Sequence, residues 1–296
     1  MKISLTIILS FLGMLSLHAQ NISDAALFSQ LKEGEKGAVV AVHIGTDDAS
    51  VSAHTIDVFN EQLQKEFPQQ AFFSVVTSNA SLSRQLSELA KDGFTHLLIQ
   101  PSFIVDDVEM TVLRQEVIQI RSEFMDIRIG EPLLSSEEDC QTIIKAISQK
   151  YGGKNANLLL GEGSSYMTQA FNSPYTFIQY AISSPSMLKK LKGDWYVATL
   201  YGYPTLQNAM ERMQANKEKK VNIITLHFSP SSTIQNEVTE TMKSQILPAG
   251  FKATATHQAL GELPEVIERF MEHARFAATH RSLSPIEEKF SHSYHY

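Results

Sequence analysis

The segment GAVVAVHIG, residues 37–45, decides the fold. Its central run, 38–44, is short, apolar and rich in β-branched side chains, and a glycine stands at each end. Such a run predicts a strand that is buried on both faces. Because a sheet of such strands needs helices on both sides, the segment favours an α/β protein.

The alternation of strand and helix continues outward from this segment. Apolar side chains recur at helical spacing over 51–67, and Pro68 ends that helix. Further strands are expected at 72–76, 96–100, 127–129, 157–160, 196–200, 222–227 and 252–256. Further helices are expected at 81–91, 108–124, from about Ser136, and at 166–182, 206–215, 235–246 and 264–278. Connections of this length imply parallel strands, so the two successive sets predict two similar lobes, each a parallel sheet flanked by helices.

The first twenty residues have the features of a secretory signal peptide. Lys2 is followed by an apolar run over 3–17, and the small Ala19 precedes the expected cut. This run is short for a membrane span, and no other hydrophobic stretch of spanning length follows it. We therefore expect an exported protein, periplasmic or associated with the cell surface, with no membrane span in the mature chain. The other predicted boundaries are an N-terminal extension at 21–36, lobes at 37–152 and 153–280 on either side of a polar linker, and a flexible tail at 281–296.

Composition excludes several classes of protein. The chain has 296 residues, of which 43% are hydrophobic and 19% charged, which is typical of a globular protein and not of a disordered or fibrous one. Only 25 Lys and Arg face 32 Asp and Glu, without a dense basic cluster, so we expect no nucleic-acid partner. The single cysteine, Cys140, excludes an internal disulfide and a Cys-based zinc or iron–sulfur site.

A ligand is expected at the loops that follow the strands, because open parallel sheets bind ligands beyond the carboxyl ends of their strands. Gly161-Glu162-Gly163 is not a phosphate loop but a tight turn that presents one carboxylate, either to a site or simply to solvent. His227, at the end of a predicted strand, is either a satisfied core histidine or a ligand. The sequence contains no zinc-protease motif and no serine or cysteine with an evident base partner.

The order and spacing of these loops resemble those of the anaerobic cobalt chelatases, which insert Co(II) into sirohydrochlorin. The most specific motif is Gly130-Glu131-Pro132-Leu133-Leu134-Ser135-Ser136. Other matching stretches lie at 42–46, 77–78, 100–109, 160–163, 203–204 and 261–262. The resemblance implies two α/β lobes around a cleft that holds a tetrapyrrole, with Co(II) or Fe(II) as substrate metal and no required cofactor or ATP. Because two pyrrole protons leave as the metal enters, it also implies proton acceptors and an open metal position.

The chain departs from the family at the metal site that the resemblance implies. Glu162 stands where the family has a histidine between two glycines, and Tyr201 lies at or next to the position of the family's glutamate. Thr233 lies near the position of a second histidine, and Phe103 replaces a histidine that is common in the third-strand loop, whereas Glu109 is retained. The loss of both metal-site imidazoles removes ligands that suit Co(II) or Fe(II).

From this resemblance we expect Glu162 and Glu109 to be catalytic residues, with Glu162 as the proton acceptor and Glu109, Tyr201 and His227 assisting it. Glu162 and His227 are expected to hold the metal. Residues expected to contact the tetrapyrrole are His43, Thr46, Phe103, Tyr201, Tyr203 and Thr233.

Two other hypotheses remain open at this point. The chain could be a catalytically degenerate protein that binds haem or a related tetrapyrrole for haem or iron acquisition, with a Tyr, His or Met as axial ligand. It could also bind a ligand unrelated to tetrapyrroles. The sequence is compatible with a homo-oligomer.

Overall fold

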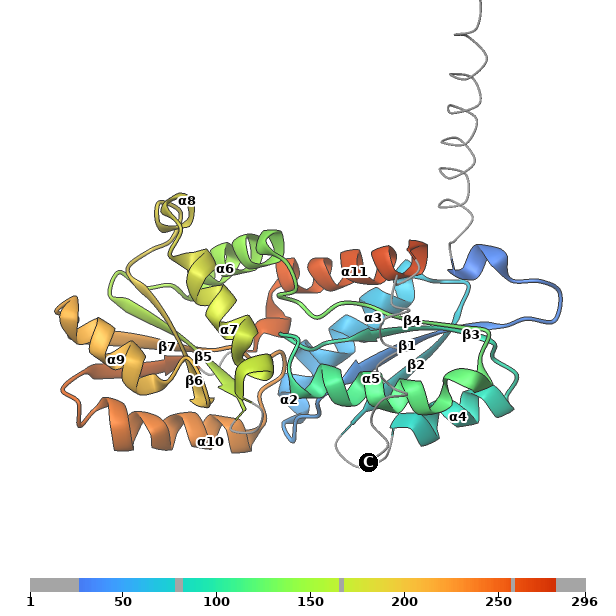
Figure 1. Ribbon diagram of the computed structural model, residues 1–296, viewed down its shortest axis with the longest axis horizontal. Coiled ribbons are helices and arrows are strands. Elements are labelled where there is room, and N and C mark those ends of the chain that lie inside the picture. Colours follow the sequence, from blue (N-terminus) through green and yellow to red (C-terminus); the bar gives the residue numbers. More distant parts are fainter. Residues whose placement is uncertain (1–26, 78–81, 165–167, 257–258, 281–296) are drawn as a thin grey trace, which may run out of the picture.

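The computed structural model describes residues 27–77, 82–164, 168–256 and 259–280. It contains two four-stranded parallel sheets with the same strand order. The first has the order β2-β1-β3-β4, with β1 Gly37–His43, β2 Ala71–Val76, β3 His96–Pro101 and β4 Asp126–Ile129. The second has the order β6-β5-β7-β8, with β5 Ala156–Gly163, β6 Trp195–Tyr201, β7 Lys220–Thr225 and β8 Lys252–Thr256. The predicted fold class is confirmed (Figure 1), while the predicted signal peptide and tail lie outside the described residues.

Helices flank both sheets. Those of the first half are α2 Ala49–His54, α3 Ile56–Glu66, α4 Leu82–Lys91, α5 Val108–Ile120 and α6 Glu137–Tyr151. Those of the second half are α7 Thr168–Ile182, α8 Pro185–Leu188, α9 Leu206–Ala215, α10 Ser232–Thr241 and α11 Pro264–Thr279. Short turns complete the chain: η1 Leu27–Gln30, η2 Arg121–Glu123, the π-helical η3 Met242–Ile246 and η4 Leu260–Glu262. Within the described ranges, no helix is both long and apolar enough to cross a membrane.

Strand β1 is buried along its whole length, as its apolar run predicts. Val39 and Ala41 belong to a core that extends into both lobes, whereas Val40 and Val42 belong to the core on the opposite face of the sheet, beneath α4 and α5. A strand that supplies two cores needs apolar side chains at every position, so its sequence cannot alternate.

The helix predicted over 51–67 is interrupted at Thr55, which has non-helical φ and ψ of −125° and −75°. The Thr55 hydroxyl lies 2.6 Å from the carbonyl oxygen of Val51 and 3.1 Å from Oγ of Ser229, which belongs to the other lobe. The interruption therefore places a buried hydroxyl where the two lobes meet.

Two helices cross between the lobes (Figure 1). α6 follows the first sheet but packs on α7, and α11 follows the second sheet but packs on α3, β3 and β4. On α11, Phe270 contacts Phe59 of α3 and Phe228 of the second lobe, with ring centroids 5.4 and 5.7 Å apart. The predicted boundary at 152/153 falls between the two sheets, while the packing of α6 and α11 crosses it, because the apolar face of α11 completes the core of the first lobe.

The motif Gly130–Ser136 joins the first sheet to both crossing helices. Ser136, where the sequence predicts a helix to begin, caps α6 in a reciprocal pair with Asp139. The buried Asp139 carboxylate accepts hydrogen bonds from Ser135 Oγ and Ser136 N, both at 2.9 Å, and contacts His273 of α11 at 3.2 Å. Burial alone would raise the pKa of Asp139, but these hydrogen bonds outweigh it and lower the pKa to about 2.

Candidate functional site

A cavity opens between the lobes at the carboxyl ends of the strands, where the topology predicts a ligand. Counted out to its open side, the space between these residues is about 640 Å³, part of which is open solvent. The first lobe lines it with Ile44, Gly45, Ser102, Phe103, Ile104, Val105, Asp107 and Glu109. The second lobe lines it with Glu162, Tyr175, Leu226, His227, Phe228, Ser229, Pro230, Ser231 and Ile234.

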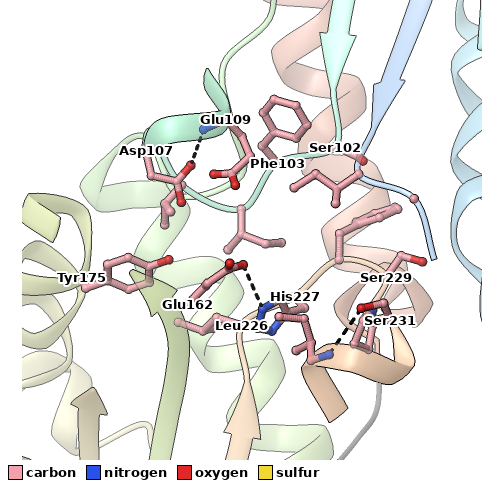
Figure 2. Close-up of a pocket in the computed structure, with 17 residues that line it drawn as sticks. Ser102, Phe103, Asp107, Glu109, Glu162, Tyr175, Leu226, His227, Ser229 and Ser231 are labelled. Atoms are coloured by element: carbon pink, nitrogen blue, oxygen red, sulfur yellow. Dashed lines mark hydrogen bonds and ion pairs between the residues drawn. The ribbon is translucent and has the colours of Figure 1, made fainter. Parts of the chain in front are cut away.

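Acidic side chains enter this cavity from both lobes (Figure 2). Asp107 is the N-cap of α5 and accepts a hydrogen bond from the backbone N–H of Glu109 at 3.3 Å. Glu162 comes from the other lobe, near the end of β5, which continues through Gly161-Glu162-Gly163 where the sequence predicts a tight turn. At Gly163, the last residue of β5, the backbone has a φ of +71°, in the left-handed region that favours glycine, so the end of this strand requires that residue.

The acidic side chains that line the cavity from the two lobes affect the pKa of Asp107. Burial raises the pKa of Asp107 to about 10, with further contributions from the neighbouring Glu109 and the charge of Glu162. Asp107 therefore holds a proton at neutral pH. A cation in the cavity would act in the opposite direction and favour the ionised carboxylates.

His227 has both ring nitrogens buried without a hydrogen-bond partner among the described residues. Its Nε2 lies 3.9 Å from Oε2 of Glu162, which is an ion-pair distance and not a hydrogen bond (Figure 2). A buried polar group without a partner costs free energy, so such groups are rare in native structures and concentrate at functional sites. Of the two interpretations of His227 from the sequence, the unsatisfied ring favours a ligand over a core histidine.

Tyr175 of α7 completes the wall beside Glu162. Its ring is buried against Gly161, and its hydroxyl lies 3.4 Å from the backbone N–H of Gly163. Burial raises the pKa of Tyr175 well above its usual range, with smaller contributions from the acidic residues of the cavity. The phenol is therefore neutral and shapes the wall without adding charge.

Replacing Gly161 by alanine is expected to destabilise the protein by about 1–3 kcal/mol, because the new methyl group would overlap the ring of Tyr175. Thermal or denaturant unfolding measures this. Gly153→Ala is the matched control, since a methyl group there meets no atom within 3.7 Å. Equal stability of the two variants would show that the ring of Tyr175 yields without cost.

The loop after β1 bridges the lobes at one edge of the cavity. Asp47 accepts hydrogen bonds from the backbone N–H of Ser232, at 2.7 Å, and from its hydroxyl, so it binds the amino end of α10. These bonds lower the pKa of Asp47. Thr46, predicted to contact the tetrapyrrole, donates instead to the carbonyl oxygen of Pro230 at 3.2 Å and is absent from the cavity lining.

Four of the residues expected at the site line the cavity: Phe103, Glu109, Glu162 and His227. His43 does not, because its ring is wholly buried, 2.8 Å from Ser102 Oγ and 2.9 Å from Asn60 Oδ1. Burial lowers the pKa of His43 to about 4, so the ring is neutral and supports the loop that carries Ser102.

The remaining expected contacts lie outside the lining. Tyr201 and Tyr203, 44% and 54% exposed, follow β6, and Thr233 is exposed near the start of α10. Sequence reasoning did not assign Asp107, although an aspartate directly before a predicted helix is an N-cap signal at the correct edge of the sheet.

No three His, Cys, Asp or Glu side chains among the described residues are grouped so that they could hold a metal ion. The expected metal pair, Glu162 and His227, are neighbours, and a metal between them would need its other ligands from elsewhere.

Comparison with known proteins agrees with the resemblance seen in the sequence. The chain is 22% identical over 259 residues to the sirohydrochlorin cobaltochelatase of Salmonella typhimurium (strain LT2), covering 80% of this chain and 95% of that protein. Its fold is similar to that of SirB from Bacillus subtilis, solved with Fe³⁺, with a TM-score of 0.58 and 17% identity over 86% of this chain and 98% of that one.

A second structural neighbour is DR2241 from Deinococcus radiodurans, a multi-domain protein described as similar to chelatases. Its TM-score is 0.55 at 14% identity, and the match covers 81% of this chain and 55% of that one. The family model described as cobalt chelatase (CbiK) matches residues 37–279. Because this match spans most of the chain, the protein belongs to the cobalt chelatase (CbiK) family.

Proposed function

We propose that this protein exchanges a divalent metal with a tetrapyrrole held in the interlobe cavity, without ATP. The observation that carries the proposal is the ring of His227, whose nitrogens have no hydrogen-bond partner among the described residues. It lies beside Glu162 in a cavity that the carboxyl groups of Asp107 and Glu109 also line. Family membership supplies the reaction class, and this cluster supplies groups that the reaction needs.

Insertion of a divalent metal into a free-base tetrapyrrole releases two pyrrole protons. The Glu162 carboxylate and an unprotonated nitrogen of His227 are acceptors within 3.9 Å of each other, so both protons can leave on the same side. The same two groups bind the incoming metal weakly, and the macrocycle nitrogens supply the missing ligands. A complete set of protein ligands would retain the metal, so an incomplete set suits a metal that is transferred to the macrocycle.

We propose Co(II) or Fe(II) as the substrate metal and no resident cofactor. The mature chain, residues 21–296, is mixed anaerobically with Co(II) and, in separate experiments, with sirohydrochlorin and with a porphyrin. With at least one of these macrocycles, the absorbance change of metallation is expected to be faster than the protein-free rate. A rate equal to the protein-free rate with every macrocycle and with both metals would refute catalysis.

A second candidate function is tetrapyrrole binding without catalysis, in which His227 ligates the iron of haem. The buried imidazole nitrogens, which have no hydrogen-bond partner in the part of the chain that the structure describes, favour it, as does the replacement of the family's metal-site histidines. A shifted and saturable Soret band, without metallation above the protein-free rate, is the result expected of this alternative.

We also propose that the protein is exported, since Lys2 and the apolar run after it have the pattern of a signal peptide. Fractionation of cells that express the full chain, with sequencing of the mature N-terminus, is expected to find a cleaved form outside the cytoplasm. An uncleaved chain confined to the cytoplasm would contradict this.

A further inference from the structure

A second cavity adjoins the first on the side of the N-terminal lobe and shares Phe103 and Glu109 with it. Leu82, Val108, Val112 and Leu113 make its walls apolar. Val108 and Val112 are 37% and 50% exposed on α5, although aliphatic side chains are usually covered. The two adjoining cavities, taken together as the combined cavity, have an apolar end and an acidic end.

In the part of the chain that the structure describes, the lining of the combined cavity offers an anion no Lys or Arg side chain, and its acidic side chains outnumber its one histidine, His227. Among the described residues, its lining contains four acidic side chains, Asp107, Glu109, Glu116 and Glu162, and neither Lys nor Arg. Arg114, on the same helix α5, is bound by both carboxylate oxygens of Asp106, at 2.7 and 3.0 Å. The Glu116 carboxylate accepts a hydrogen bond from the backbone N–H of Ser83 in the first turn of α4, at 2.8 Å.

The pKa of Asp107 shows how this environment affects a carboxyl group. Burial, together with Glu109 and Glu162, raises the pKa of Asp107 to about 10. A carboxylate of a ligand in the same place would lose water and meet the charges of Glu109 and Glu162, and no described Lys or Arg lines the cavity to pair with it.

We propose that the combined cavity selects tetrapyrroles by their peripheral charge, accepting an apolar edge free of carboxylates and excluding macrocycles that carry carboxylates all round. Protoporphyrin-type rings, whose propionates are confined to one edge, have the accepted form. Uroporphyrin-type rings and sirohydrochlorin have the excluded form. This inference rests on the proposed function, because it assumes that a tetrapyrrole occupies the cavity, and it separates this chain from the substrate named for its Salmonella relative.

The test uses metal-free porphyrins, so that binding is measured apart from metal chemistry. Fluorescence titration of the mature chain is expected to give a dissociation constant about tenfold lower for deuteroporphyrin, a dicarboxylate, than for uroporphyrin, an octacarboxylate, at low salt. The difference is expected to shrink as salt screens the acidic lining.

Val112→Lys places one positive charge in the lining on a helix that tolerates lysine, and it is expected to tighten uroporphyrin binding several-fold. Met125→Lys is the matched control, because Met125 is 67% exposed and precedes β4 at the opposite edge of the sheet. It is expected to leave both affinities unchanged.

The outcomes separate the two proposals. Equal or tighter binding of uroporphyrin by the unmodified protein overturns the selection by charge but leaves the proposed function intact. If Val112→Lys, like Met125→Lys, leaves the affinity for uroporphyrin unchanged, the selection by charge is likewise overturned while the proposed function stays intact. Absence of binding to deuteroporphyrin, uroporphyrin and sirohydrochlorin overturns both proposals.

Discussion

Metallation is expected to fall about a hundredfold when His227 is replaced by alanine, and by a similar factor when Glu162 is replaced by glutamine. Each change removes one of the two proton acceptors that lie 3.9 Å apart. Neither change is expected to lower stability much, because the ring nitrogens of His227 have no partner to lose among the described residues and Glu162 is 45% exposed. Macrocycle binding, followed by absorbance, is expected to stay within a few-fold of the unmodified protein.

The double variant distinguishes a working pair from two independent groups. If Glu162 and His227 act together, the double variant is about as slow as either single variant, because the second change removes nothing further. His54→Ala and Glu240→Gln are the matched controls, since both side chains are exposed and lie outside the cavity. Single variants that keep the full rate would exclude this pair as the proton acceptors, even if the protein is a chelatase.

The sequence predicts well what depends on local patterns. The apolar run over 38–44 requires two buried faces, so the sheet could be placed. The glycines around Glu162 indicate a strand end, so its carboxylate could be placed there, although β5 continues through Gly163 and the expected tight turn is absent from 161–163. The capping pair of Ser136 and Asp139 could be placed for the same reason, because it joins residues three apart.

The sequence predicts poorly the contacts that depend on how the two lobes meet. His43 and His227 both stand at strand ends, yet the first ring is held by Ser102 and Asn60 while the second has no described partner. Thr46 bonds to Pro230 of the other lobe, 184 positions away. No local pattern encodes which side chains at strand ends form hydrogen bonds with distant parts of the chain. Residue type alone therefore could not distinguish a side chain held by such bonds, like His43, from one that lines the cavity, like His227.

Replacing Asp139 by alanine is expected to lower the free energy of unfolding by about 3 kcal/mol, because it removes the acceptor shared by Ser135, Ser136 and the two basic side chains of α11. Those two are Arg269, whose Nε lies 3.3 Å from the carboxylate, and His273, at 3.2 Å. Both are largely buried, at 16% and 12% exposure, and would be left with fewer partners.

The same carboxylate makes stability depend on pH. The pKa of Asp139 is about 2 in the folded protein and 3.8 as its ordinary value, so the ionised form stabilises the fold fully above pH 4 and progressively less as the pH falls toward 2. At neutral pH this contribution is about 2 kcal/mol. Denaturant unfolding at pH 7 and below pH 3 measures it. The difference in stability between Asp139→Ala and the unmodified protein should be smaller at the lower pH.

Glu138→Ala is the control for the Asp139 prediction, because its side chain is 81% exposed and lies 3.8 Å from the same Arg269. It is expected to leave stability nearly unchanged.

Asp139 ties the motif Gly130–Ser136 and α6 to α11, and α11 packs on the first lobe. Loss of the Asp139 carboxylate therefore also loosens the contact between the lobes. The walls of the cavity come from both lobes, so metallation by Asp139→Ala should fall although no residue of the lining is changed. Full activity in a clearly destabilised variant would show that the cavity keeps its form without this joint.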